Sequence, residues 1–250
     1  MPGTETMAYV LSTKDYRDTS LLASFFTMEY GNIKAIIKGG RDAKYRYGST
    51  LEPFSLNRIT VYKRKRGDLH MVTAVELVDR FNALRTDLSK LGWASYLTEL
   101  LNQLTDSEQH ADVFHLMADA LHFMSRHQGE AKVVVIFEVK LLRALGLTPA
   151  LQYCIHCRQK EAAQWFFAVH SGGIVCENCK SKEESVRLIS HEGVRFLQTC
   201  MRSTIQEAWM TAIEDGDLSS AKQIMRQFCE HHLSYKPKSL DFLNKIGVLA

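Results

Sequence analysis

The first 80 residues alternate apolar and polar positions over short stretches, which is the period-two pattern of half-buried β-strands. Residues 21–27 predict one strand, and Tyr30-Gly31-Asn32 predicts a turn. Residues 33–38 predict a second strand, in which Lys34, Ile36 and Lys38 share one face and Ile33, Ala35 and Ile37 share the other.

Two further strands are predicted at residues 57–66 and 69–78, on either side of Gly67-Asp68. Glycine at the first central position of a two-residue loop is typical of a type II′ hairpin turn. Residues 39–49 contain glycine and arginine and predict a loop. Five or so strands within about 75 residues predict a small closed or nearly closed β-barrel.

The pattern changes to helical spacing near residue 85. Thr86 or Asp87 can cap a helix, and apolar residues then recur three and four positions apart as far as Leu104. Further helices are predicted near residues 110–127, 130–146, 190–203 and 218–234.

At 250 residues the chain can form one large domain or two modest ones. The change of pattern predicts an α+β protein, with a barrel domain followed by a helical domain that carries a cysteine-containing insert. The predicted limits are residues 1–80, 81–250 and, for the insert, 151–182.

Residues 133–147 form the most apolar run, but charged residues interrupt it, so we expect a buried helix rather than a membrane span. The N-terminal residues have neither the basic start nor the apolar centre of a signal peptide. We therefore expect a cytoplasmic protein with reduced thiols. Its six cysteines should bind metal or be buried rather than form disulfides.

The net charge of +3 is distributed unevenly. Residues 30–66 hold ten Lys and Arg against Asp42 and Glu52, a local balance of +8, whereas the remainder carries a balance of −5. Such asymmetry indicates a surface that binds a polyanion.

Cys154-Ile-His-Cys157 and Cys176-Glu-Asn-Cys179 form two C-x₂-C pairs separated by 18 residues. This spacing is typical of a zinc site, in which two tight turns complete a tetrahedral shell of four thiolates. We therefore predict structural Zn²⁺ bound by Cys154, Cys157, Cys176 and Cys179.

Alternatives to structural zinc fit the pattern less well. A redox C-x-x-C normally stands alone, iron–sulfur clusters usually group three cysteines closely, and a catalytic zinc keeps an open position. His156 could replace a thiolate, although four cysteines leave no need for it. Cys200 and Cys229 lie in predicted helices and are expected to be buried thiols.

Basic residues gather on the predicted barrel, on one strand face, in the following loop and at the end of a later strand. The candidate nucleic-acid contacts are Lys34, Lys38, Arg41, Lys44, Arg46, Lys63, Arg64, Lys65 and Arg66. Tyr45 and Tyr47 lie between the loop cations. Cations attract phosphates and aromatic rings stack on bases, so the pattern predicts nucleic-acid binding. The alternative is a solvated hairpin tip at residues 63–66, with tyrosines that close the barrel.

The sequence contains none of the common catalytic or phosphate-binding motifs: no G-x-x-x-x-G-K-[ST], G-x-G-x-x-G, H-E-x-x-H or G-x-S-x-G. No pair of acid and base residues has a distinguishing context. We therefore expect a non-enzymatic protein.

Several stretches, in the same order along the chain, resemble the RecO family of bacterial DNA-repair and recombination-mediator proteins. They are Lys38-Gly39-Gly40-Arg41 with Lys44, Arg46, Gly48, Leu51, Glu52, Pro53 and Phe54; Phe137-Glu138; Leu141-Leu142-Arg143-Ala144-Leu145-Gly146 with Pro149; the first cysteine pair; and Lys238-Ser239-Leu240-Asp241-Phe242-Leu243.

The resemblance implies an N-terminal OB-fold, a helical domain and a zinc-binding insert. It further implies a nucleoid-associated protein that binds single- and double-stranded DNA, anneals complementary strands and helps RecA replace single-strand binding protein, with RecR as partner. The family's DNA contacts carry over to Lys38, Arg41, Lys44 and Arg46, whereas residues 63–66 rest on charge alone. Because some members lack the cysteines, the zinc is expected to be architectural.

A rival hypothesis is a scaffold whose main ligand is protein. In that case the basic residues would dock an acidic peptide, such as the tail of single-strand binding protein. The RecA filament is a further candidate partner. DNA retention and strand annealing by the purified protein would distinguish the two hypotheses.

Overall fold

The computed structural model describes residues 3–40, 48–63, 69–104 and 110–249. The chain divides into two compact units, one made of Met1–Arg126 with Pro237–Ala250 and the other of His127–Lys236. The domain limits proposed from the sequence (1–80, 81–250 and 151–182) remain a prediction.

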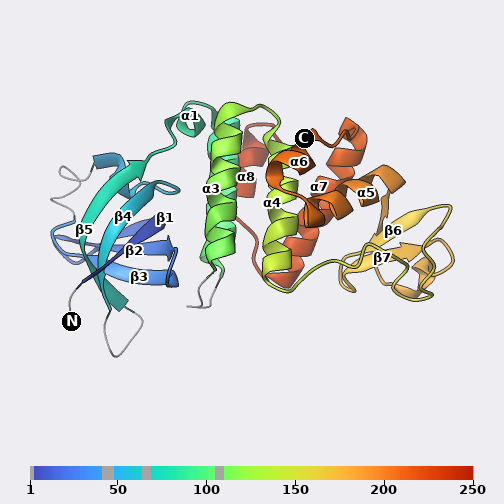
Figure 1. Cartoon of the computed structure of the whole chain (residues 1–250), viewed down its shortest axis with the longest axis horizontal. Helices are drawn as coiled ribbons and strands as arrows, with labels where there is room; N and C mark the ends of the chain where they lie inside the picture. The colour runs from blue at the N-terminus through green and yellow to red at the C-terminus, as the bar shows by residue number, and fades with distance from the viewer. Residues whose placement is uncertain (1–2, 41–47, 64–68, 105–109, 250) are drawn as a thin grey trace. The chain divides into compact units, whose positions relative to one another are not determined.

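The first unit begins with a closed five-stranded barrel in the order β1-β2-β3-β5-β4 (Figure 1). Its strands are β1 (Thr4–Tyr16), β2 (Ser20–Thr27), β3 (Gly31–Ile37), β4 (Leu56–Tyr62) and β5 (Leu69–Asp79). Neighbours are antiparallel except for β3 and β5, which run parallel. Because β1 pairs with both β2 and β4, the barrel closes. The predicted α+β class with an OB-like barrel is confirmed.

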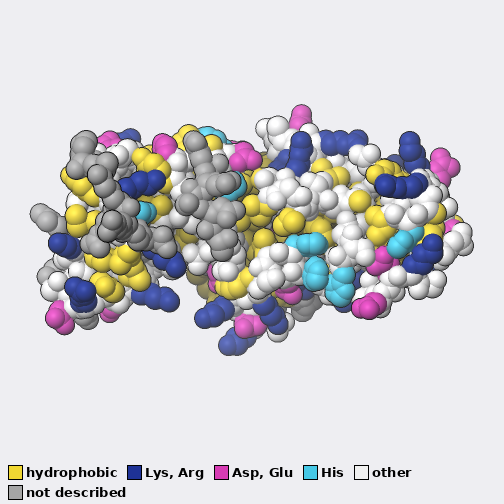
Figure 2. Space-filling model, turned by 90° about the horizontal axis from the view of Figure 1, so that it is seen from below, with side chains coloured by type: hydrophobic (Ala, Val, Ile, Leu, Met, Phe, Trp, Pro, Cys, Tyr) yellow, Lys and Arg dark blue, Asp and Glu magenta, His cyan; other side chains and the backbone are white. Residues whose placement is uncertain are grey.

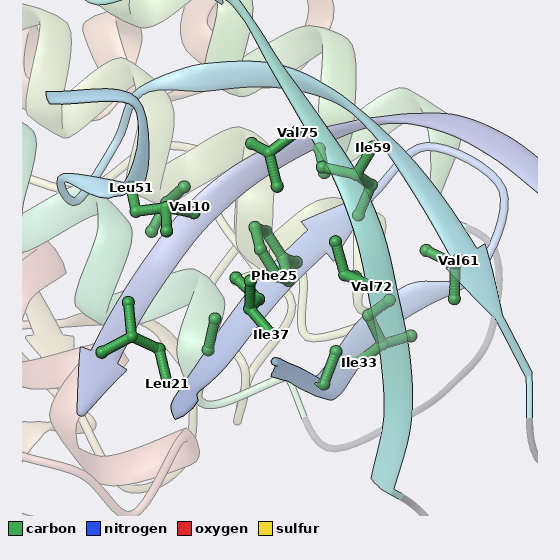
Figure 3. Close-up of a cluster of buried hydrophobic side chains, with 13 residues drawn as sticks. Val10, Leu21, Phe25, Ile33, Ile37, Leu51, Ile59, Val61, Val72 and Val75 are labelled. Carbon is green, nitrogen blue, oxygen red and sulfur yellow. The ribbon is translucent and has the colours of Figure 1, made fainter. Parts of the chain in front are cut away.

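The barrel interior is filled by side chains from alternate strand positions. In β3, Ile33, Ala35 and Ile37 are buried while Lys34 is exposed, as the alternation predicts. Figure 3 shows the side chains of this core, among them Phe25 of β2, directed toward one another. Each large apolar side chain buried here contributes about 1.5–3 kcal/mol to folding.

The helices of the first unit are α1 (Asn82–Arg85), α2 (Leu88–Asn102), α3 (Ala111–Arg126) and α8 (Ser239–Lys245), and a short 3₁₀-helix, η2, covers Gly48–Leu51. Of the two predicted caps, Thr86 and Asp87, it is Asp87 that caps α2: its carboxylate accepts bonds from Ser89 N (2.8 Å) and Lys90 N (3.1 Å). A Cβ at Gly92 would lie 2.5 Å from Leu243 Cδ2, so this glycine permits close packing of α8 on α2.

The second unit combines helices with a small sheet. Its elements are α4 (Glu130–Ala144), β6 (Trp165–Ala168), β7 (Gly173–Cys176), η3 (Lys180–Lys182), β8 (Val186–Ile189), α5 (His191–Arg202), α6 (Ile205–Met210) and α7 (Asp215–His232). The strands pair in the order β7-β6-β8, all antiparallel. As predicted from its apolar run, α4 is largely buried.

The predicted longer helices are confirmed, with ends shifted by a few residues. The sequence did not predict α1, α6, α8 or the sheet of the insert, because four-residue strands and one- or two-turn helices are too short to show a period. Among the described residues, no helix is long and apolar enough to cross a membrane.

Candidate metal centre and nucleic-acid interface

The four predicted ligand cysteines meet in one place. The Sγ atoms of Cys154, Cys157, Cys176 and Cys179 all lie within 4.8 Å of one another, and theirs is the one metal-competent group among the described residues. Cys154 and Cys157 precede β6, Cys176 ends β7, and Cys179 precedes η3. Antiparallel pairing of β6 with β7 folds the chain back and brings the second pair to the first.

Each cysteine pair lies on a tight turn. Arg158 N donates to Cys154 O (2.9 Å), and Cys179 N donates to Cys176 O (3.0 Å). Arg158 has a φ of 65°, a left-handed conformation that reverses the chain directly after Cys157. Its guanidinium then lies over the Tyr153 ring, 4.5 Å from the centroid. The turns therefore aim both thiols of each pair at a common point.

The donor set fits a tetrahedral metal. Zn–S bonds of ~2.3 Å in a regular tetrahedron separate neighbouring sulfurs by ~3.8 Å. The Sγ atoms of Cys157 and Cys176 are 3.8 Å apart. Cys157 is exposed, whereas the other three cysteines are buried, so the centre is reached from one side.

The thiols of this cluster differ in acidity. Burial opposes ionisation of Cys154, but hydrogen bonds from the backbone of Cys157, Cys176 and His156 lower its pKa to about 6. Burial, reinforced by the neighbouring thiols, raises the pKa of Cys179 to about 12. Four thiolates repel one another in a buried site, so full ionisation requires a bound cation.

His156 is directed to a carboxylate rather than to the sulfur cluster. Its Nε2 lies 2.7 Å from Glu183 Oε1, and Ser171 Oγ donates to Glu183 Oε2 at 2.6 Å. The Glu183 side chain is only 8% exposed. The carboxylate of Glu183 thus links the first cysteine turn, through His156, to the β6–β7 connection, through Ser171. The cluster is a closed Cys₄ set, which is typical of a structural site.

The remaining two cysteines are buried, as expected. Cys200 lies in α5 and Cys229 in α7, with exposed fractions of 0% and 1%. Burial raises the pKa of Cys200 to about 12 and that of Cys229 well above its ordinary value. Both are therefore inert packing residues in the native protein.

Three of the predicted nucleic-acid contacts lie in the described part of the chain. Lys34 and Lys38 are exposed on and just after β3, and Lys63 is exposed directly after β4. Lys34 and Lys63 line the same cavity, although they come from different strands. Figure 2 shows Lys and Arg side chains bordering hydrophobic surface over the barrel. Arg41, Lys44, Arg46, Arg64, Lys65 and Arg66, with Tyr45 and Tyr47, lie outside the described residues.

Sequence reasoning missed the other residues around Lys34 and Lys63. The cavity is also lined by Ser24, Tyr30 and His70. Tyr30 was assigned only to a turn, yet its ring lies beneath the Lys63 ammonium, with Nζ 3.7 Å from the centroid. The one feature of the sequence that pointed to this contact was that Tyr30 is an aromatic residue at a turn in a basic segment.

Known proteins match this chain over nearly its whole length. A family model described as "Recombination protein O N terminal" matches residues 1–81, and one described as "Recombination protein O C terminal" matches residues 85–241. A protein named DNA repair protein RecO from Myxococcus xanthus is 30% identical over 247 residues, which cover 96% of this chain and 97% of that protein. Proteins of the same name from Alkaliphilus metalliredigens (28% over 245 residues, 97% and 99% covered) and Halalkalibacterium halodurans (25% over 238 residues, 95% and 92% covered) are also similar.

Proposed function

Because the chain belongs to the RecO family of DNA repair proteins, we propose that it acts as a recombination mediator that binds DNA through its barrel. It binds single- and double-stranded DNA, anneals complementary strands, and helps RecA replace single-strand binding protein together with RecR. The proposal includes association with the bacterial nucleoid. It assigns no chemical step to the chain.

The observation that carries the proposal is the concentration of positive charge on a closed OB-like barrel. The local balance of +8 at residues 30–66 falls on a fold whose second and third strands commonly bind oligonucleotides. Lys34 lies on β3 itself. A polyanion is the ligand that such a field attracts. In DNA repair, the process in which the family acts, this polyanion is DNA.

The proposed DNA-binding surface includes Lys34, Lys38 and Lys63. It also includes two adjacent basic segments of the sequence. The loop segment supplies Arg41, Lys44 and Arg46, and the hairpin segment supplies Arg64, Lys65 and Arg66. Lysine and arginine hold phosphates by charge, independently of sequence. The barrel therefore binds many sequences, as an annealing protein must.

The metal of the proposal is Zn²⁺, held by Cys154, Cys157, Cys176 and Cys179. Bound zinc would cross-link the insert and stabilise its folded state. In comparable small sites, the free energy of zinc binding that contributes to folding is on the order of 10 kcal/mol. The helical part of the chain supplies the surface that binds RecR. The same part would contact the tail of single-strand binding protein or the RecA filament.

The test is fluorescence anisotropy of a labelled single-stranded oligonucleotide at several salt concentrations. Wild type is compared with a variant in which Lys38, Arg41, Lys44 and Arg46 are all changed to Ala. For every phosphate that the variant no longer neutralises, the slope of log K against log salt should flatten by about 0.7. The variant should therefore lose most of its affinity at low salt and respond less to added salt.

A matched control removes the same charge elsewhere. Lys160, Lys182, Arg187 and Lys236 are exposed in the second unit, and their joint change to Ala should leave DNA affinity nearly unchanged. If the loop variant folds and binds like wild type, the loop is not the DNA surface. If wild type itself retains no DNA and binds an acidic peptide instead, the protein is the docking scaffold and the proposal is wrong.

A further inference from the structure

A cavity of about 380 Å³ opens on the barrel beside the basic residues. Its lining comes from β1, β2, β3, β5, the end of β4 and the end of α2, and includes Ser24, Tyr30, Lys34, Lys63 and His70. Small-molecule sites in proteins usually measure about 300–1,000 Å³. The cavity is thus large enough for a flat ring system of modest size and too small for a folded element.

An aromatic ring and two cations meet at this cavity. The Lys63 ammonium lies 3.7 Å above the centroid of Tyr30, a close cation–π contact. Lys34 is exposed on β3 and lies opposite Leu69 of β5 across the parallel pair. The cavity therefore places an aromatic ring and positive charge together, the pairing by which proteins hold a nucleobase and its phosphates. The Lys63 ammonium covers the Tyr30 ring in the unbound protein, so a base reaches this ring when Lys63 turns to a phosphate.

The walls of the cavity are fixed by the fold. Asn32 Nδ2 donates to Leu101 O (2.8 Å) and Leu104 O (2.5 Å), which attaches the end of α2 to β3. Ser24 pairs with Lys34 in the β2–β3 register. A site that is already formed loses little entropy when a ligand enters.

We propose that this cavity takes one unpaired nucleobase of a single DNA strand, with the neighbouring phosphates at Lys34 and Lys63. The base lies against Tyr30, and polar side chains such as Ser24 and His70 meet its edge. This site deepens the proposed function and rests on it, since it presupposes that the barrel binds DNA.

The cavity makes the barrel prefer single-stranded to double-stranded DNA, a preference that charge alone does not produce. A base within a duplex is stacked and paired, and it enters a pocket only when it is flipped out at a cost. A single strand offers its bases freely. Phosphate contacts therefore serve both forms of DNA, whereas the cavity favours the single strand.

The test removes a single base from the ligand. Wild-type affinity is measured for a short single-stranded oligonucleotide and for a set in which one abasic site is moved along the strand. Loss of one stacked base should weaken binding by about 5- to 100-fold at the position that enters the cavity. 2-Aminopurine at that position should change its fluorescence on binding, because its stacking partners change.

Three variants then locate the effect in the cavity. Ser24→Leu fills it and should bind intact and abasic strands alike, with unchanged affinity for a blunt-ended duplex without a loop. Lys63→Met removes the ammonium from an exposed position, so folding is not at risk, and should weaken binding of intact and abasic strands alike, because Lys63 holds a phosphate rather than the base. Thr73→Leu adds the same bulk at an exposed position of β5 that does not line the cavity, and should behave as wild type.

The outcomes separate this inference from the proposed function. If wild type binds intact and abasic strands equally at every position, the cavity takes no base, while DNA binding by the barrel stands. The inference is also wrong if folded Ser24→Leu keeps the full abasic penalty. If wild type binds no DNA at all, both fail together.

Discussion

The Sγ atoms of Cys157 and Cys176 lie 3.8 Å apart, although the two residues are 19 positions apart in the chain. One is exposed and the other is buried. The contact joins the first cysteine turn to the end of β7, so the insert is closed by this cluster as well as by its three short strands.

We predict that the purified protein carries one zinc ion per chain and loses it to a strong chelator. Removal should expose the amides of residues 154–182 to hydrogen exchange, because four-residue strands alone cannot hold the insert. Acid should have the same effect, since protons compete with the metal for thiolates. Metal analysis and hydrogen-exchange mass spectrometry check both points. Full protection of the insert without metal would contradict the prediction.

A second prediction concerns the order in which the thiols react. After chelation, iodoacetamide should modify the four cluster cysteines Cys154, Cys157, Cys176 and Cys179 first, because the insert opens when the metal leaves. Cys200 and Cys229 should remain unmodified until denaturant is added, because both are buried and burial raises their pKa values. Peptide mass mapping over time gives the order. Early modification of Cys200 would show that α5 opens readily.

The third prediction follows from the raised pKa of Cys200, about 12 in the folded state against an ordinary value of 9.0. Between these values the unfolded chain loses a proton that the folded chain retains, so stability falls as the pH rises above 9. The slope for one such thiol is about 1.4 kcal/mol per pH unit. Cys200→Ala should show a shallower fall.

Urea unfolding at a series of pH values from 8 upward measures this slope. Met201→Leu is the control, because it alters a neighbouring buried side chain without a titrating group. Equal slopes for Cys200→Ala and wild type would mean that the thiol does not contribute to the alkaline loss of stability.

The fourth prediction concerns Asn32, whose amide holds the carbonyls of Leu101 and Leu104. Asn32→Ala leaves these two acceptors without their side-chain donor and should cost about 1–3 kcal/mol of stability. Asn102→Ala, at an exposed position of the same helix end, should cost little. Denaturant unfolding compares the two. A similar cost for both variants would mean that the bonds of Asn32 contribute no special stability.

Local pattern alone predicted much of this fold. Alternation placed Ile33, Ala35 and Ile37 inside and Lys34 outside, and a cap at Thr86 or Asp87 was expected at the start of α2, where Asp87 lies. Both are local features: strand side chains alternate by backbone geometry, and a helix cap bonds to amides two and three residues away. The C-x₂-C spacing is local in the same sense, and it predicted which four cysteines the fold brings together.

Contacts between distant segments could not be predicted in this way. The lysine–tyrosine contact at the cavity, the bonds from Asn32 to the end of α2, and the packing of α8 on Gly92 join residues far apart in sequence. None has a periodic signal, because each depends on how completed elements pack. The sequence by itself thus determined the alternation, the longer helices to within a few residues, and the set of four cysteines that cluster. Only the tertiary structure decided which side chains meet, since side-chain packing between distant elements depends on the folded arrangement of the backbone.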